Sequence, residues 1–115
     1  MNMEIVKKAI ISVNGKAEEV EAIIDSGADR TMINEEVLLR IGAPHLGNRG
    51  VQSMGEFKHI KPQYAADVEI DGCGFGLVVF GGKKNIIGHD FLQLAKAVLN
   101  EETGDVKFTK NWIEM

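Results

Sequence analysis

Two-residue turn signals divide much of this chain into short β-strand segments. Asn14-Gly15 separates two runs rich in β-branched residues, 4–13 and 18–24, and Asp71-Gly72 separates two further runs. Both pairs favour tight hairpins, because Asn, Asp and Gly tolerate positive φ angles. Hairpins at this spacing predict a mainly β fold, and a chain of 115 residues is expected to form a single domain over 1–115.

Two short segments are typical of helices instead. Asn34 is a favourable N-cap, and the acidic pair Glu35-Glu36 follows it, where the helix dipole favours negative charge. Gly42 is expected to end this helix. Residues 89–97 also have helical spacing of their apolar positions. The pattern therefore predicts a closed, barrel-like, mainly β domain with one or two short helices.

Glycines make the middle of the chain harder to interpret. Residues 43–63 form the least regular stretch, in which Gly50 to Phe57 is predicted to be the tip of a hairpin. Gly81-Gly82 is predicted to turn the chain toward Ile86-Ile87.

Composition limits the partners of this protein. The formal net charge is −4 and the basic residues are scattered, which disfavours nucleic acid or an anionic membrane surface, since both require a basic face. The single cysteine, Cys73, excludes an intrachain disulfide. The first residues do not have the pattern of a signal peptide, so a cytoplasmic location is expected.

One loop presents a carboxylate in a distinctive way. The apolar pair Ile23-Ile24 runs directly into Asp25-Ser26-Gly27, and this pattern occurs once. A reaction that needs two such carboxylates must therefore take the second from another copy of the chain. The alternative is an ordinary Asx-type turn at the end of a strand.

Two segments resemble motifs of the retropepsin-like aspartic proteases. They are Ile23 to Ala28 and the later block Asn85-Ile86-Ile87-Gly88-His89-Asp90-Phe91-Leu92. The resemblance spans roughly residues 5 to 110. It implies a retropepsin (acid protease) fold with one lobe per chain. It also implies a homodimer in which two Asp25 carboxylates activate a water to hydrolyse a polypeptide substrate, with no cofactor.

The resemblance also implies roles for individual residues. Asp25 is the expected catalytic residue, and the supports of its loop are Ser26, Gly27 and Ala28. The expected substrate-binding residues are Gly27, Asp29, Arg30, Met54, Gly55, Phe57 and Ile87. The expected dimer and loop supports are His89 and Asp90. Many retroviral members carry Arg at the position of His89, where it pairs with the acidic residue that matches Asp29.

Two alternatives remain open on the sequence. The chain could be a catalytically silent retropepsin-like domain that serves as a dimerisation or peptide-binding module, because fold alone does not determine activity. A metal site is not expected, since the candidate ligands lack zinc-site spacing. Those candidates are His45, His59, His89 and Cys73.

Overall fold

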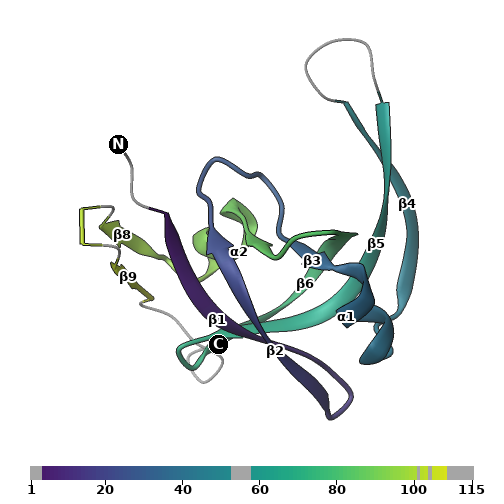
Figure 1. Cartoon of the computed structure of the whole chain (residues 1–115), viewed down its shortest axis with the longest axis horizontal. Helices are drawn as coiled ribbons and strands as arrows, with labels where there is room; N and C mark the ends of the chain where they lie inside the picture. Colours follow the sequence, from purple (N-terminus) through teal and green to yellow (C-terminus); the bar gives the residue numbers. More distant parts are fainter. Residues whose placement is uncertain (1–3, 53–57, 101, 104, 109–115) are drawn as a thin grey trace.

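A seven-stranded sheet makes up most of the computed structural model, which describes residues 4–52, 58–100, 102–103 and 105–108 (Figure 1). The elements in chain order are β1 (Ile5–Val13), β2 (Lys16–Ile24), β3 (Met32–Asn34), α1 (Glu35–Arg40), β4 (His45–Gln52), β5 (Lys58–Ile70), β6 (Cys73–Gly82), β7 (Ile86–Ile87), α2 (His89–Leu94), β8 (Val98–Asn100) and β9 (Asp105–Lys107). Strands β8 and β9 form a separate two-stranded sheet.

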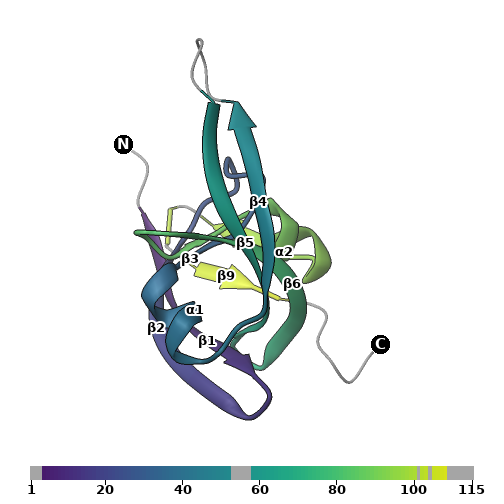
Figure 2. The ribbon, with the colours of Figure 1, turned by 90° about the vertical axis from the view of Figure 1, so that its right-hand side faces the viewer.

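The large sheet closes on itself. Its strand order is β1-β2-β7-β3-β6-β5-β4, and β1 also pairs with β5. Only β4 lies outside this ring, as an extension of β5. Figures 1 and 2 show β4 and β5 projecting together beyond the other strands. The mainly β fold with a closed sheet and two short helices is confirmed.

Both predicted hairpin turns are present. Asn14 and Gly15 have φ angles of 49° and 84°, and Asp71 and Gly72 have 52° and 79°. Positive φ at both central residues matches the right-handed twist of the flanking strands. The strands then pair in direct continuation of each turn, as Val13 opposite Lys16 shows.

The first predicted helix is also confirmed, with its N-cap. The side chain of Asn34 accepts a hydrogen bond from the backbone N–H of Glu36 at 2.9 Å. Val37 and Leu38 face the core and are 5% and 0% exposed. Gly42 follows the helix with a φ of +74°, a conformation that ends helices readily. Neither α1 nor α2 is long and apolar enough to cross a membrane.

The structure corrects two sequence predictions. The stretch expected to be irregular contains the paired strands β4 and β5, so Gly50 lies within β4, opposite Ile60, and not at a hairpin tip. Gly81 and Gly82 continue β6 and pair with β3 instead of forming a turn. A Cβ on Gly81 would lie 2.9 Å from the Tyr64 ring. Glycine there serves close packing, which overrides its low strand propensity.

The core joins the closed sheet to both helices. The largest fully buried side chains include Ile11, Ile33, Leu38, Ile87 and Phe91. The Phe91 ring contacts that of Phe75 edge to face at 5.6 Å between centroids, a favoured aromatic geometry. This core holds α2 beneath the loop that follows β2.

Tyr64 provides a spectroscopic test of this fold, because it is the only tyrosine in the chain. The residue is 4% exposed, and its hydroxyl donates to Glu35 at 2.6 Å. That hydrogen bond, aided by burial, raises the pKa of Tyr64 to about 12. We expect tyrosinate absorbance to titrate near this value in the folded protein and near 10 in denaturant. The stabilisation is complete below about pH 10 and is lost as the pH rises toward 12.

Two variants separate the hydrogen bond from burial. Glu35→Gln should bring the titration midpoint of Tyr64 down toward its ordinary value, since the charged acceptor is gone. Glu36→Gln changes the neighbouring carboxylate, which is not the acceptor of the tyrosine hydroxyl, and should leave the midpoint near 12. A wild-type midpoint near 10 in the folded protein would contradict the contact.

Candidate active site

Asp25 directly follows β2, on a loop whose backbone is fixed to β7. β2 and β7 pair in parallel, with Ile24 opposite Ile87, and the N–H of Asp25 donates to the carbonyl of Ile87 at 2.9 Å. The chain then turns, with the N–H of Ala28 donating to the carbonyl of Asp25 at 3.1 Å. The N–H of Gly27 donates to Oδ1 of Asp25 at 2.9 Å. The carboxylate is therefore oriented by its own loop while it stays exposed.

The start of α2 supports this loop from the core side. The N–H of His89 donates to the carbonyl of Ala28 at 2.6 Å, and the N–H of Asp90 donates to that of Asp29 at 3.3 Å. The approach is close enough that a Cβ on Gly88 would lie 2.7 Å from the backbone carbonyl of Arg30. Two backbone bonds and one close approach thus hold the loop against α2.

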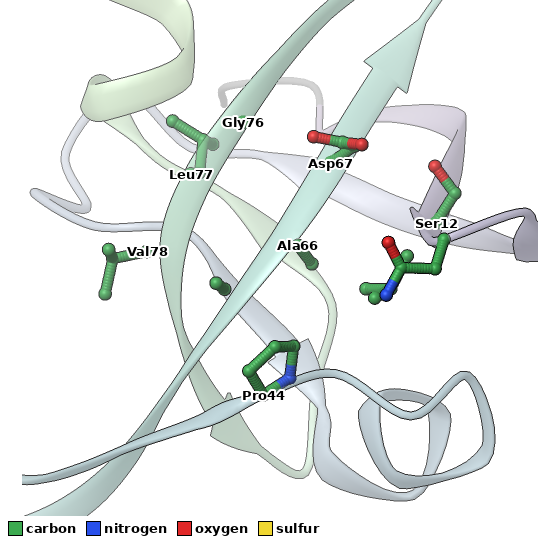
Figure 3. Close-up of a pocket in the computed structure, with 10 residues that line it drawn as sticks. Ser12, Pro44, Ala66, Asp67, Gly76, Leu77 and Val78 are labelled. Atoms are coloured by element: carbon green, nitrogen blue, oxygen red, sulfur yellow. The ribbon is translucent and has the colours of Figure 1, made fainter.

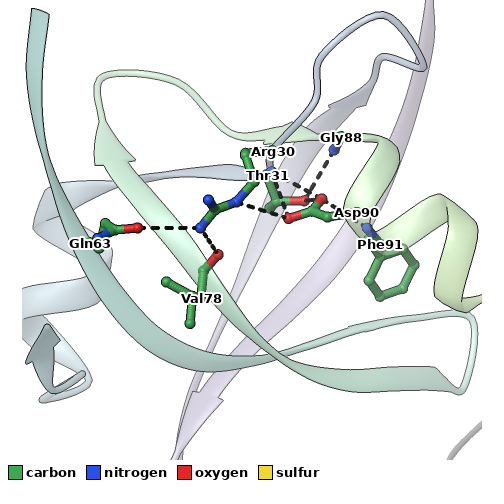
Figure 4. Close-up of polar contacts among 7 residues, drawn as sticks. All are labelled: Arg30, Thr31, Gln63, Val78, Gly88, Asp90 and Phe91. Atoms are coloured by element: carbon green, nitrogen blue, oxygen red, sulfur yellow. Dashed lines mark hydrogen bonds and ion pairs between the residues drawn. The ribbon is translucent and has the colours of Figure 1, made fainter. Parts of the chain in front are cut away.

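Thr31 and Asp90 form the buried polar centre of this contact (Figure 4). Thr31 is fully buried; its hydroxyl donates to Oδ1 of Asp90 at 2.7 Å and accepts from the N–H of Gly88 at 3.1 Å. Asp90 also accepts from the backbone N–H groups of Thr31, at 3.0 Å, and of Phe91, at 2.8 Å. The buried hydroxyl of Thr31 and the half-buried carboxylate of Asp90 are both hydrogen-bonded, so hydrogen bonds compensate for their desolvation. The network therefore fixes the loop.

Arg30 is held on the other side of Asp90. Its Nε lies 3.9 Å from Oδ2 of Asp90, and its Nη2 donates to the carbonyl of Val78 at 3.0 Å and, more weakly, to Gln63 at 3.4 Å. The guanidinium carbon also lies 4.8 Å from the centroid of the Phe80 ring, within cation–π range. Figure 4 shows the contacts of Arg30 with Asp90, Val78 and Gln63. The positive charge of Arg30 therefore has a defined position.

A pocket of about 660 Å³ lies between the Asp25 loop and the β4–β5 hairpin. The loop, the sheet and the hairpin each contribute part of its wall. The lining residues are Ala28, Asp29, Arg30, Met32, Arg49, Gly50, Lys61, Phe80 and Ile86. A cavity of this size, whose wall includes Ala28 and Asp29 of the loop that carries Asp25, can hold a side chain of an extended ligand.

The structure places the predicted site residues in different settings. Ser26 and Gly27 are exposed beside Asp25, and Asp29 and Arg30 line the pocket. Ile87, expected at the substrate, is fully buried in the core. Its neighbour Ile86 lines the pocket instead, because consecutive strand residues point to opposite faces.

The remaining predicted residues fall on the segment 53–57 of the sequence and on α2. Met54, Gly55 and Phe57 lie outside the described residues. His89 is exposed, and its imidazole makes no hydrogen bond or ion pair with any residue that the structure describes. Its contribution to the loop is its backbone N–H, while dimer support by its side chain stays a prediction.

Sequence reasoning assigned no role in the site to several residues of this region. Thr31 and Gly88 form the support of the loop, and Arg49 and Lys61 line the pocket. The signal for Thr31 was weak, since a single Thr after a loop is common. Arg49 and Lys61 become partners only through the β4–β5 register, which the sequence did not reveal.

A second pocket, of about 410 Å³, lies on β1, β5 and β6 near Pro44 (Figure 3). Asp67 is the only ionisable residue in its lining, and none of the loop residues from Asp25 to Arg30 reaches it. In the described segments, no group of three or more His, Cys, Asp or Glu side chains is placed to hold a metal ion. Among the described residues, the oriented carboxylate of Asp25 is the candidate for the chemistry of this chain.

Comparisons with known proteins give a family match and a structural similarity. The family model described as retroviral aspartyl protease matches residues 7–100. The structure is similar to that of EIAV protease complexed with the inhibitor HBY-793, with a TM-score of 0.64 and 17% sequence identity. That similarity covers 84% of this chain and 92% of the other. No curated protein sequence matches significantly.

Proposed function

Because this chain belongs to the retroviral aspartyl protease family, we propose that it hydrolyses peptide bonds as a symmetric homodimer. The observation that carries this proposal is the carboxylate of Asp25, exposed on a loop that is fixed by β7 and α2. Each chain supplies one such carboxylate, so a catalytic pair forms when two chains meet at a two-fold axis.

In the dimer, the two Asp25 carboxylates share one proton, as in other aspartic protease dyads, because two adjacent charges repel. The ionised carboxylate takes a proton from water while the water oxygen bonds to the scissile carbonyl carbon. The protonated carboxyl donates to the carbonyl oxygen and so stabilises the developing charge. Collapse of the tetrahedral intermediate then breaks the C–N bond as the amine leaves with a proton.

Residues next to Asp25 complete the proposed site. Gly27 and Ala28 keep side chains small beside the dyad, and the N–H of Gly27 orients the carboxylate. An extended substrate fits between the loop and the β4–β5 hairpin, where it can add backbone hydrogen bonds. Its side chains then enter the pocket lined by Asp29 and Arg30.

The test is cleavage of a diverse peptide library by the purified protein, analysed by mass spectrometry from about pH 4 to pH 7, a range that spans carboxylate and histidine titration. We expect cleavage of defined bonds and a dimeric mass in solution. A strict monomer at every pH would exclude a shared dyad. A folded dimer without cleavage would indicate the silent peptide-binding module instead.

A further inference from the structure

The pocket between the Asp25 loop and the β4–β5 hairpin is positively charged in a chain whose net charge is −4. Three cationic side chains line it, those of Arg30, Arg49 and Lys61, against the single carboxylate of Asp29. Even when Asp90, the ion-pair partner of Arg30, is included, the cations outnumber the carboxylates. This local excess of positive charge favours a negatively charged group as the ligand of the pocket.

Two of these cations face each other across the hairpin. Arg49 and Lys61 are direct partners in the antiparallel register of β4 and β5, so their side chains lie on the same face. Like charges in directly opposite positions destabilise a strand pair. Neither side chain has a hydrogen bond or ion pair with another described residue. An anion between them would relieve this repulsion.

Arg30 adds a cation of fixed position to this pair. Its bonds to Val78 and Gln63 and its contact with the Phe80 ring hold the guanidinium at the pocket wall. An ordered cation loses little conformational entropy when it binds a ligand. The pocket therefore combines one preorganised cation with two that no described residue pairs.

We propose that this pocket selects an acidic side chain, Asp or Glu, of the polypeptide substrate, close to the bond that is cleaved. The closeness follows from the chain itself, since Ala28 and Asp29 of the pocket wall come directly after the Asp25 turn. This inference rests on the proposed function, because it names the substrate class of that same site.

The test measures binding separately from cleavage. The full chain with Asp25→Asn is titrated against two matched libraries of fluorescent peptides. One library has Glu at a fixed position and the other has Gln at the same position, and the fixed position is moved along the peptide from one experiment to the next. We expect Glu at one position to bind about five- to tenfold more tightly than Gln, in keeping with a few partly exposed ion pairs. The preference should shrink as salt screens the charges.

Variants then assign the preference to this pocket. Arg49→Gln combined with Lys61→Gln should reduce it to less than about twofold, and the single charge reversal Lys61→Glu should weaken it as well. Lys16→Gln removes an exposed lysine at the β1–β2 turn, outside the pocket lining, and should leave the preference unchanged.

The outcomes separate the two proposals. Equal binding of both libraries, no binding of either, or a Glu preference that survives the double variant would overturn the acidic-pocket inference. Cleavage by the wild type without a Glu preference would overturn this inference alone. Glu-selective binding without any wild-type cleavage would support the pocket and overturn the proposed protease activity.

Discussion

Replacing Asp25 by Asn is expected to reduce peptide cleavage by at least about a thousandfold, the scale of losing general acid–base catalysis. The amide can neither accept a proton from water nor share one across the dyad. The fold should survive, because Oδ1 of Asn can still accept the hydrogen bond that Gly27 donates to the carboxylate. The measurements are initial cleavage rate, circular dichroism and solution mass, compared between the two proteins.

Mixing wild-type and Asp25→Asn chains tests whether the site is shared between two chains. After subunit exchange at equal concentrations, only dimers with two wild-type chains are active, about a quarter of the total for random pairing in a symmetric dimer. A site complete within one chain would instead retain about half of the activity. A mixture that keeps half the activity, or a mutant that cleaves normally, would contradict the proposed dyad.

Substituting Gly88 by Ala is expected to cost about 2–3 kcal/mol of unfolding free energy, as overpacking in a tight contact does, and to lower cleavage as well. The added Cβ would lie 2.7 Å from the carbonyl carbon and oxygen of Arg30 and 2.8 Å from the carbonyl oxygen of Ala28. These are backbone atoms, so no side-chain rotation relieves the contact. Either α2 or the Asp25 loop must shift. Urea denaturation measures the loss.

Gly50→Ala is the matched control for this effect. Gly50 has ordinary backbone geometry, and a Cβ there would meet nothing within 4 Å. The substitution should leave stability within about 1 kcal/mol of wild type. Gly88 also has an unexceptional φ of −98°, so backbone strain does not separate the two positions. Equal stability of both variants would show that α2 does not clamp the loop as the structure indicates.

Local sequence signals predicted the features that depend on neighbouring residues. The two hairpin turns follow from Asn-Gly and Asp-Gly pairs, which need no distant contact to favour positive φ. The N-cap by Asn34 likewise depends on a hydrogen bond to a residue two positions away. The exposed carboxylate of Asp25 followed from an apolar strand that enters a small, glycine-containing turn.

Features that depend on packing were not predictable in this way. Gly81 lies within a strand and is a glycine because the Tyr64 ring occupies the space that a side chain there would need. Ile86 lines the pocket and Ile87 lies in the core, because the register of β7 decides which of the two residues faces the pocket. In both cases the structure depends on contacts with residues far along the chain, and a local sequence pattern carries no information about such contacts.

The sequence by itself determined a mainly β chain with one turn-held carboxylate and a resemblance to dimeric aspartic proteases. Only the tertiary structure decided how that carboxylate is supported and what surrounds it. Thr31, Gly88 and Asp90 meet because α2 packs under the loop, and Arg49 meets Lys61 because β4 pairs with β5 in one register. The physical reason is that backbone preferences act over a few residues, whereas burial and charge act between whichever residues the fold brings together.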